Sequence, residues 1–146
     1  MDITIRPITA ADCEAVIEMM KVFYASDAVS TNGSQEIFEA DVKNCISENP
    51  YLEGYVFETE KGIEGYAMVA KSFSTEFGKP CKWIEDLYIK ESLRGSGAGT
   101  KFMKYIETKY PDSIFRLEVE EENTGAVRLY EKMGYTRIYY EEMVKL

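Results

Sequence analysis

The sequence predicts an α/β fold (α+β) in which helices flank a mixed, largely antiparallel central sheet. Stretches with the two-residue alternation of strands and stretches with the spacing of amphipathic helices follow one another along the 146 residues. A turn at Lys61-Gly62 joins two strand patterns into an antiparallel hairpin, and a further strand pattern closes the chain. Because no linker or repeat interrupts this order, residues 1–146 are expected to form a single domain.

The first half of the chain is expected to hold a short strand, two helices and the hairpin. Residues 2–6 alternate and stop at Pro7, and Thr9 with Asp12 then fits a capping box for the first helix. Ser34 is expected to cap the second helix, which ends before Pro50. The hairpin strands are placed at residues 55–60 and 65–71. The expected core-facing residues are Cys13, Val16, Ile17, Met20, Phe23 and Tyr24 in the first helix and Ile37, Phe38, Val42, Cys45 and Ile46 in the second.

The second half is expected to contain three or four strands and two helices. A connection at residues 72–80 leads to a strand at 82–89, and a strand at 114–119 follows a helix that ends at Pro111. Thr124 is expected to cap the last helix, which Gly134 closes. Residues 135–145 predict one or two final strands. The expected core-facing residues are Phe102, Met103, Ile106 and Tyr110 in the earlier helix and Ala126, Val127, Tyr130 and Met133 in the later one.

Composition excludes several classes of function. The net charge of −9 argues against a protein that binds nucleic acid through a broad basic face, and it is compatible with cationic substrates. No apolar run approaches the roughly 20 residues that span a bilayer, and no signal pattern opens the chain, so no membrane partner is expected. The three cysteines are scattered and no CxxC pair exists, which predicts neither a disulfide framework nor a zinc site and favours a reducing cytoplasm.

The chain contains no histidine. This absence removes the commonest general base, together with the Ser-His-Asp and Cys-His arrangements of nucleophilic enzymes. Acid–base chemistry must therefore use carboxylates, tyrosines, lysines, water or the substrate itself. Metal binding is not expected either, because histidine and paired cysteines are the usual ligands of structural zinc.

One stretch, residues 83–100, reads as a strand, a short turn and a glycine-rich entry into a helix. Gly95, Gly97 and Gly99 leave the backbone open to close approach. The N-terminus of a helix offers unpaired N–H groups and a positive dipole end, and Arg94 adds a cationic forked donor. The stretch is therefore expected to hold an anion, most simply the pyrophosphate of a cofactor.

Two well-known phosphate motifs do not fit this stretch. The first, GxxxxGK followed by Ser or Thr, requires a lysine that is missing here, and the dinucleotide motif GxGxxG requires a different last spacing and an early position in the chain. The pattern that remains is Arg-x-x-Gly-x-Gly, formed by Arg94, Gly97 and Gly99. A glycine-rich strand-to-helix turn without any ligand is the alternative.

This pattern resembles the acetyl-CoA loop of the GNAT N-acetyltransferase superfamily. Members of that superfamily continue with a strand, an asparagine and a helical tyrosine before a glycine turn, and this chain has Asn123, Tyr130 and Gly134 in that order. The opening Ile5-Arg6-Pro7-Ile8 also resembles a GNAT start. The resemblance spans nearly the whole chain and is specific from residue 83 to residue 135. The run Glu85-Asp86-Leu87 additionally resembles the spermidine/spermine-type diamine acetyltransferases.

The resemblance implies a GNAT-type domain that uses acetyl-CoA as cosubstrate and needs no metal. The implied reaction moves an acetyl group to a primary amine by direct attack on the thioester. A small cationic amine such as a polyamine or an amino-acid derivative is the expected acceptor. Acetylation of a protein or peptide amine is an alternative, as is a non-catalytic module that binds acyl-CoA. The sequence does not define the oligomeric state, and a homodimer is one candidate because a late strand pair commonly supports dimers in this family.

By resemblance, the cofactor would contact one strand end, the glycine turn and one asparagine. The backbone of Leu87, Tyr88 and Ile89 would pair with the pantetheine arm, although core packing alone explains their alternation. The amide of Asn123 suits the same arm, and a loop or helix-cap role fits that residue equally well. The residues expected to hold the pyrophosphate are Arg94, Gly95, Ser96, Gly97, Ala98, Gly99 and Thr100.

Two residues are expected to be catalytic. Tyr130 would donate a hydrogen bond to the departing thiolate, although its position on an apolar helix face fits a core tyrosine as well. Glu85 would take the proton of the amine, directly or through water, and Asp86 would bind the substrate. Regular strand alternation places Glu85 and Asp86 on opposite faces, so both can serve one site only if the strand is bulged. Glu118 and Glu120 are weaker base candidates.

Overall fold

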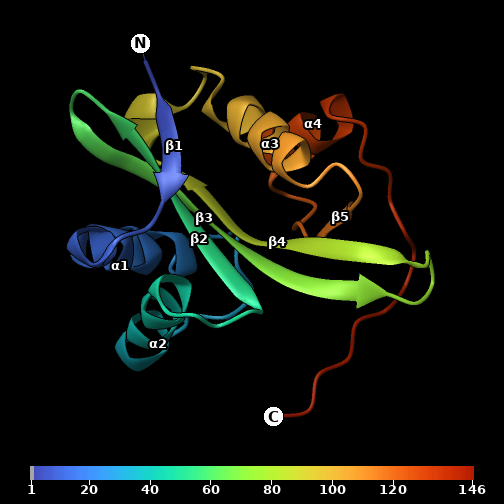
Figure 1. Cartoon of the computed structure of the whole chain (residues 1–146). Coiled ribbons are helices and arrows are strands. Elements are labelled where there is room, and N and C mark those ends of the chain that lie inside the picture. The colour runs from blue at the N-terminus through green and yellow to red at the C-terminus, as the bar shows by residue number, and fades with distance from the viewer. Residues whose placement is uncertain (1) are drawn as a thin grey trace.

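Five strands form one sheet in the order β1-β2-β3-β4-β5 in the computed structural model, which describes residues 2–146 (Figure 1). The strands are β1 (Thr4–Pro7), β2 (Leu52–Thr59), β3 (Gly62–Ser74), β4 (Lys79–Ile89) and β5 (Ile114–Leu117). The pairs from β1 to β4 are antiparallel, whereas β4 and β5 run parallel. The predicted mixed, largely antiparallel sheet is therefore confirmed.

Helices cover both faces of this sheet (Figure 1). The helices α1 (Cys13–Tyr24) and α2 (Gln35–Ile46) lie on one face, and α3 (Ala98–Lys109) and α4 (Thr124–Lys132) lie on the other. Two short 3₁₀ turns, η1 (Ala10–Asp12) and η2 (Glu91–Leu93), lead into α1 and toward α3. The sheet thus forms the middle of three layers.

Each face of the sheet carries its own hydrophobic core. On the α1/α2 face, the residues buried together include Val16, Met19, Met20, Phe38, Val42, Val56, Tyr66 and Met68. On the α3 face they include Tyr55, Phe57, Val69, Ile84, Phe102, Met103 and Ile106. Met19 was not among the predicted core residues. Ile37 and Ile46 are 51% and 42% exposed, so their predicted burial is wrong, because α2 turns only Phe38 and Val42 fully into the core.

The predicted starts of the first two helices are confirmed by hydrogen bonds. The backbone N–H of Thr9 donates to Oδ2 of Asp12 over 2.8 Å, and Arg6 donates to the same carboxylate oxygen over 2.7 Å. In α2, the side-chain oxygen of Ser34 accepts from the backbone N–H of Ile37 over 3.2 Å. The bonds from the backbone N–H groups of Thr9 and Ile37 satisfy donors that a helix start leaves unpaired.

The β3–β4 hairpin is longer than the sequence predicts. Residues 72–74 and 79–81 pair with each other, so most of the connection expected at residues 72–80 is strand and only residues 75–78 form the turn. Pro80 tolerates this position because β5 pairs with β4 only from Cys81 onward. The outer end of the hairpin, beyond both β2 and β5, therefore forms a two-stranded arm (Figure 1).

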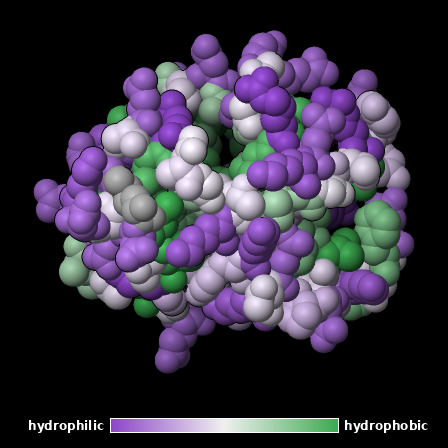
Figure 2. All heavy atoms as spheres, turned by 90° about the horizontal axis from the view of Figure 1, so that it is seen from above, coloured by the Kyte–Doolittle hydropathy of each residue, from purple (hydrophilic) through white to green (hydrophobic). Residues whose placement is uncertain are grey.

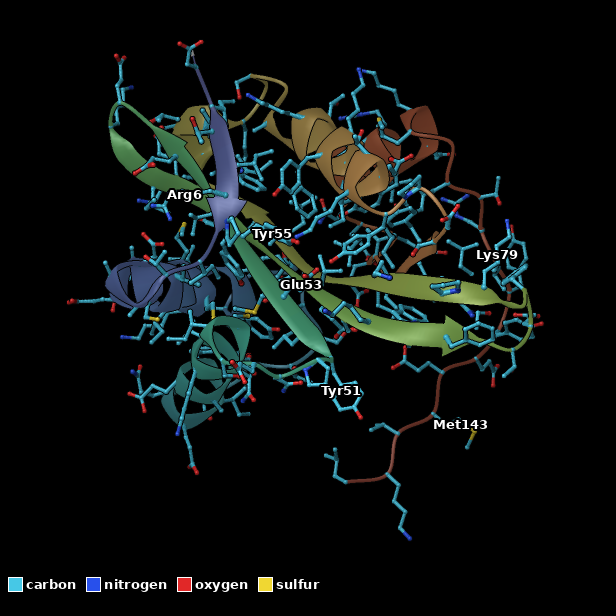
Figure 3. All side chains as sticks on the ribbon, in the orientation of Figure 1. Arg6, Tyr51, Glu53, Tyr55, Lys79 and Met143 are labelled. Atoms are coloured by element: carbon cyan, nitrogen blue, oxygen red, sulfur yellow. The ribbon has the colours of Figure 1, made fainter. Side chains whose placement is uncertain are left out.

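The C-terminal segment differs most from the prediction. Residues 135–146 contain no strand, so the one or two final strands expected there are wrong, and β5 stops at Leu117 rather than at residue 119. The segment runs past the tip of the β3–β4 arm (Figure 1), where the Tyr140 hydroxyl donates to Glu76 over 2.7 Å. Met143 projects away from the body of the protein (Figure 3). Alternation alone does not make a strand, because a strand also needs a ladder partner.

Candidate active site

The sheet opens between β4 and β5. These strands pair only through Cys81–Ile84 and Ile114–Leu117, so residues 85–89 of β4 have no strand neighbour on that side within the described chain. A groove of about 680 Å³ lies at this opening, and we call it the β4–α4 groove. It is lined by Leu87 and Ile89 of β4, by the glycine-rich turn, by the N-terminal part and Tyr130 of α4, and by residues 26–28.

Figure 2 shows the molecule from above, where the surface is hollowed between hydrophilic side chains and hydrophobic residues lie inside the hollows. The groove has the same character, because Leu87, Ile89 and Leu129 line it together with the polar Asn123. An apolar lining with few polar groups is typical of sites for small molecules and cofactors. No cluster of three or more metal-binding side chains occurs among residues 2–146, and no helix there is long and apolar enough to cross a membrane.

Two different structural constraints require glycine at the three positions of the turn. Gly95 and Gly97 have φ angles of +79° and +86°, which side chains rarely adopt, and Gly97 is the residue before the first turn of α3. Gly99 lies inside the helix, where an added Cβ would stand 2.7 Å from Cδ2 of Leu129 on α4. The first two glycines thus shape the turn, and the third allows α3 and α4 to approach.

The turn places the N-terminus of α3 at the groove. The backbone N–H groups of the first helical turn are the ones that a helix leaves without partners, and the helix dipole adds positive potential there. Gly95, Gly97, Ala98, Gly99 and Thr100 all line the groove. Ser96 does not line it, because its hydroxyl donates to the backbone oxygen of Leu93 over 2.5 Å.

Arg94 lines the groove and also ties the turn to β4. Its Nε donates to the backbone oxygen of Ile89 over 2.9 Å, and its guanidinium carbon lies 5.8 Å from the centre of the Tyr88 ring. Arg94 therefore fixes the position of the turn in addition to bringing a positive charge. Tyr88 itself turns to the α1 face, where its ring lies 5.7 Å from that of Phe23.

Asn123 caps α4 and lines the groove. Its Oδ1 accepts from the backbone N–H of Ala126 over 3.4 Å, so Asn123, rather than the predicted Thr124, is the capping residue. The cap uses the amide oxygen as an acceptor, and the two N–H donors of Nδ2 take no part in it. The two roles that the sequence suggested for Asn123, cap and groove residue, are therefore compatible in this geometry.

Tyr130 stands on α4 between the core and the groove. It packs against the α3-side core and lies 5.9 Å from the ring of Tyr135, while its own side chain lines the groove. Burial raises the pKa of Tyr130 to about 12, so the hydroxyl keeps its proton at neutral pH. A neutral hydroxyl in an apolar groove can donate one hydrogen bond to a ligand.

A bulge in β4 lies directly before the groove-lining residue Leu87, and neither Glu85 nor Asp86 is part of the groove lining. Met68 pairs with Asp86 and the next residue, Val69, pairs with Ile84, so Glu85 is an extra residue in β4. Ile84 is buried in the α3-side core, whereas Asp86 bonds to Tyr66 in the α1-side core. This arrangement reverses the normal alternation and turns Glu85 and Asp86 to the same side. The bulge that a shared role for these two residues requires is present.

Asp86 is buried and held by two tyrosines. Its Oδ2 accepts from the hydroxyl of Tyr66 over 2.7 Å, and its Oδ1 accepts from the hydroxyl of Tyr24 over 3.1 Å. These bonds lower the pKa of Asp86, but burial outweighs them and the net shift is upward. Neither tyrosine was predicted as a site residue, because positions 24, 66 and 86 are far apart in the sequence and only the fold brings them together.

Carboxylates gather on this side of the sheet. Desolvation by the surrounding protein is the main cause that raises the pKa of Glu85, although its side chain still reaches solvent, and Asp86, Glu142 and Asp41 add repulsion. Burial and the charge of Asp86 raise the pKa of Asp41, on α2, to about 6. Asp41 is a further residue that sequence reasoning missed. The arrangement favours a cation, because a positive charge placed here would relieve the repulsion.

The loop between α1 and α2 reaches across the opening. Ser26, Asp27 and Ala28 of this loop line the groove. The hydroxyl of Ser30 donates to the carboxylate of Glu120, which lies between β5 and α4. Glu120, one of the weaker base candidates, is therefore engaged in holding this loop.

The fold and the groove together define an α/β domain in which the sheet opens between β4 and β5, beside the N-terminus of α3. The sequence pattern of the acetyltransferase (GNAT) family matches residues 17–135, and the chain belongs to this family. It is thus an N-acetyltransferase-type acyltransferase, and the family uses acetyl-CoA.

Individual relatives agree with this assignment. The chain is 29% identical over 145 residues to the thialysine N-epsilon-acetyltransferase of Sus scrofa, covering 90% of this chain and 83% of that protein. It is 24% identical to the spermine/spermidine N(1)-acetyltransferase of Bacillus subtilis, covering 92% and 88%. The solved structure of the aminoglycoside N-acetyltransferase AAC(6')-Iy with CoA superposes with a TM-score of 0.79 at 13% identity, covering 99% of this chain and 95% of that one.

Proposed function

We propose that this protein acetylates a primary amine of a small cationic molecule, such as a polyamine or an amino-acid derivative, by direct attack on acetyl-CoA. The observation that carries the proposal is the bulge in β4. It turns Glu85 and Asp86 to one side at the point where the edge of β4 becomes free beside the groove. A carboxylate pair therefore stands next to the place that a thioester would occupy.

The cofactor would lie along the groove in an extended form. Its pyrophosphate would accept from the backbone N–H groups at the start of α3, with the charge of Arg94 nearby. Its pantetheine amides would pair with the free backbone edge at residues 87–89, in the manner of an added strand. The Nδ2 group of Asn123 would donate to the same arm.

The chemistry needs a proton acceptor for the amine and a donor for the leaving thiolate. Glu85 takes one proton from the substrate ammonium, and the neutral nitrogen attacks the thioester carbon. When the tetrahedral intermediate collapses, the C–S bond breaks, the new C–N bond stays, and the nitrogen releases its second proton to solvent to give the neutral amide. Tyr130 donates a hydrogen bond to the departing sulfur, which stabilises the thiolate without full proton transfer.

The acceptor class follows from charge and is supported by the relatives. Glu85, Asp86 and Asp41 share one side of the sheet, and the whole chain carries a net charge of −9. The names of the two relatives reported above, a thialysine and a spermine/spermidine acetyltransferase, indicate basic amines as well. A cationic acceptor is therefore favoured over a neutral one.

An amine panel tests this proposal. The purified protein is mixed with acetyl-CoA and, in turn, spermidine, spermine, thialysine, lysine, an aminoglycoside and a basic peptide, and free thiol release is measured. Acceptor-dependent release with one of the small amines is expected. Release with the peptide alone would assign a peptide acceptor instead. Tight acetyl-CoA binding with no release across the panel would overturn the enzymatic proposal and indicate a binding module.

A further inference from the structure

Tyr24 and Tyr66 donate to the same carboxylate but occupy different environments. The Tyr66 hydroxyl bonds to Oδ2 of Asp86 over 2.7 Å, and the Tyr66 side chain is fully buried at 0% exposure. The Tyr24 hydroxyl bonds to Oδ1 of the same carboxylate over 3.1 Å, but Tyr24 is only half-buried. The two tyrosines thus form a matched pair, one inside the core and one at its border.

Tyr24 lies in a segment that borders the groove, although Tyr24 itself is not part of the groove lining. It is the last residue of α1, and the groove is lined by Phe23, immediately before it, and by Ser26, two positions after it. Burial and the neighbouring Asp86 are the main causes that raise the pKa of Tyr24, and Asp41 and Glu85 add smaller contributions, so its hydroxyl lies among the carboxylates of this side of the sheet. Tyr24 therefore connects the buried Asp86 to the end of α1, where the chain begins to border the groove.

We propose that Tyr24 binds the ammonium group of the acceptor and orients its nitrogen toward the thioester. This inference rests on the proposed function and adds a residue and a selectivity to it. Because the hydroxyl hydrogen of Tyr24 is committed to Asp86, only the lone pairs of its oxygen remain for a ligand. Those lone pairs accept from N–H groups, so Tyr24 selects an acceptor nitrogen that carries hydrogens.

The buried Asp86 strengthens this selection. A hydroxyl that donates to a carboxylate becomes a better acceptor, because hydrogen bonds in a chain polarise one another. Asp86 itself is 4% exposed and both of its oxygens already accept from tyrosines, so a ligand meets its charge through Tyr24. This arrangement replaces the direct contact between Asp86 and substrate that the sequence suggested.

Two conservative substitutions separate ligand binding from structural support. Tyr24→Phe removes the hydroxyl and keeps the ring that packs 5.2 Å from that of Phe38, and Tyr66→Phe removes the other bond to Asp86 from the interior. With spermidine and thialysine as acceptors, Tyr24→Phe is expected to raise the acceptor KM about tenfold and to leave the KM for acetyl-CoA within twofold. Tyr66→Phe is expected to lower the melting temperature and to change the acceptor KM less than threefold. Equal acceptor KM changes in the two variants would overturn the proposal.

A second measurement does not depend on turnover. Pentylamine and pentyltrimethylammonium carry the same charge and chain, but only the first has N–H groups. Their binding to the CoA-saturated protein is measured by calorimetry. The wild-type protein and Tyr66→Phe are expected to prefer pentylamine at least fivefold, whereas Tyr24→Phe should show less than a twofold preference. Because this is a ratio, a partly unfolded variant still reports it correctly.

The outcomes distinguish this inference from the proposed function. A wild-type protein that binds neither amine, or that binds both equally, overturns the role of Tyr24. A preference for pentylamine that survives in Tyr24→Phe overturns it as well. If the preference for pentylamine depends on Tyr24 but no amine in the panel is acetylated, the ammonium site is supported and only the proposed reaction is overturned.

Discussion

Glu85 and Asp86 are neighbours in the sequence and nevertheless face the same side of the sheet. Met68 pairs with Asp86 while Val69 pairs with Ile84, which leaves Glu85 as the extra residue of a bulge. In a regular strand one of the two carboxylates would point into the α3-side core, where an unpaired charge is strongly unfavourable. The bulge thus explains how one strand supplies both a buried, hydrogen-bonded carboxylate and an exposed one.

The exposed member of this pair, Glu85, is expected to act as the base. Glu85→Gln should lower kcat about 100-fold, the usual scale for a general base. The base must be ionised and its pKa is raised in the protein, so the acidic limb of the kcat profile should lie above the ordinary range of a glutamate and disappear in the variant. Acceptor-saturated rates from pH 4.5 to 8 measure both effects. Glu121→Gln, on the exposed loop before α4, is the control, and an equal loss there would contradict the assignment.

Tyr130 is expected to support departure of the thiolate. Tyr130→Phe should lower kcat between about 10-fold and 100-fold with little change in acetyl-CoA affinity, because the lost hydrogen bond forms mainly in the transition state. With a pKa of about 12, the hydroxyl stays protonated up to pH 10, so loss of Tyr130 should leave the shape of the pH profile unchanged in that range.

Steady-state kinetics, together with titration of acetyl-CoA binding, check this prediction for Tyr130. The neighbouring Tyr135, whose ring lies 5.9 Å away, provides the control as Tyr135→Phe, because it lies outside the β4–α4 groove. An unchanged rate in Tyr130→Phe would remove Tyr130 from the acid role and leave it as a core residue.

The cofactor side of the site could be predicted from sequence because its determinants are local. Arg94, Gly97 and Gly99 lie within six consecutive residues, and the turn that they predict forms beside the groove. Asn123 and Tyr130 follow on a single helix. Strand and helix periodicity likewise indicated the mixed sheet, since each pattern depends only on neighbouring residues.

The acceptor side could not be predicted because it depends on contacts between distant elements. Tyr24 and Asp86 are 62 positions apart, and no local pattern indicates that their side chains meet. The bulge at Glu85 arises from the register of β3 against β4, which the β4 sequence alone does not contain. The C-terminal residues show the opposite error, because a strand-like alternation there has no pairing partner within residues 2–146.

The turn before α3 should be sensitive to its backbone conformation. Gly97 has a φ of +86° and nothing within 4 Å of an added Cβ, so Gly97→Ala tests backbone strain without a clash. We expect a loss of about 1 kcal/mol in the free energy of unfolding and a several-fold weaker affinity for acetyl-CoA, because the strained turn would misdirect the N–H groups of α3.

Thermal unfolding and calorimetric titration with acetyl-CoA measure both consequences of Gly97→Ala. Gly125→Ala is a matched control, since Gly125 also lines the groove and has open space around it but does not have a positive φ. It should unfold at the same temperature as the wild type or slightly higher, because alanine favours helices. Equal losses in the two variants would show that the groove surface, rather than the turn conformation, matters.

Asp41 should make stability depend on pH. Burial and the charge of Asp86 raise its pKa to about 6 in the folded protein, above the value near 4 of an unfolded chain. Between these two values the folded state binds more protons, so the free energy of unfolding falls as pH rises through the window. Ionised Asp41 thus costs the folded state about 1 kcal/mol at pH 8, allowing for its partial exposure to solvent.

Asp41→Asn removes this titration and should be more stable than the wild type at pH 8. The difference should shrink as pH falls and vanish below pH 4, where Asp41 is protonated in both states. Urea unfolding at pH 4, 6 and 8 measures the trend. Glu39→Gln, at an exposed position of the same helix, should show no such window. A stability gain for Asp41→Asn that is equal at all three pH values would mean that the amide packs better, and it would contradict repulsion between Asp41 and Asp86 as the cause.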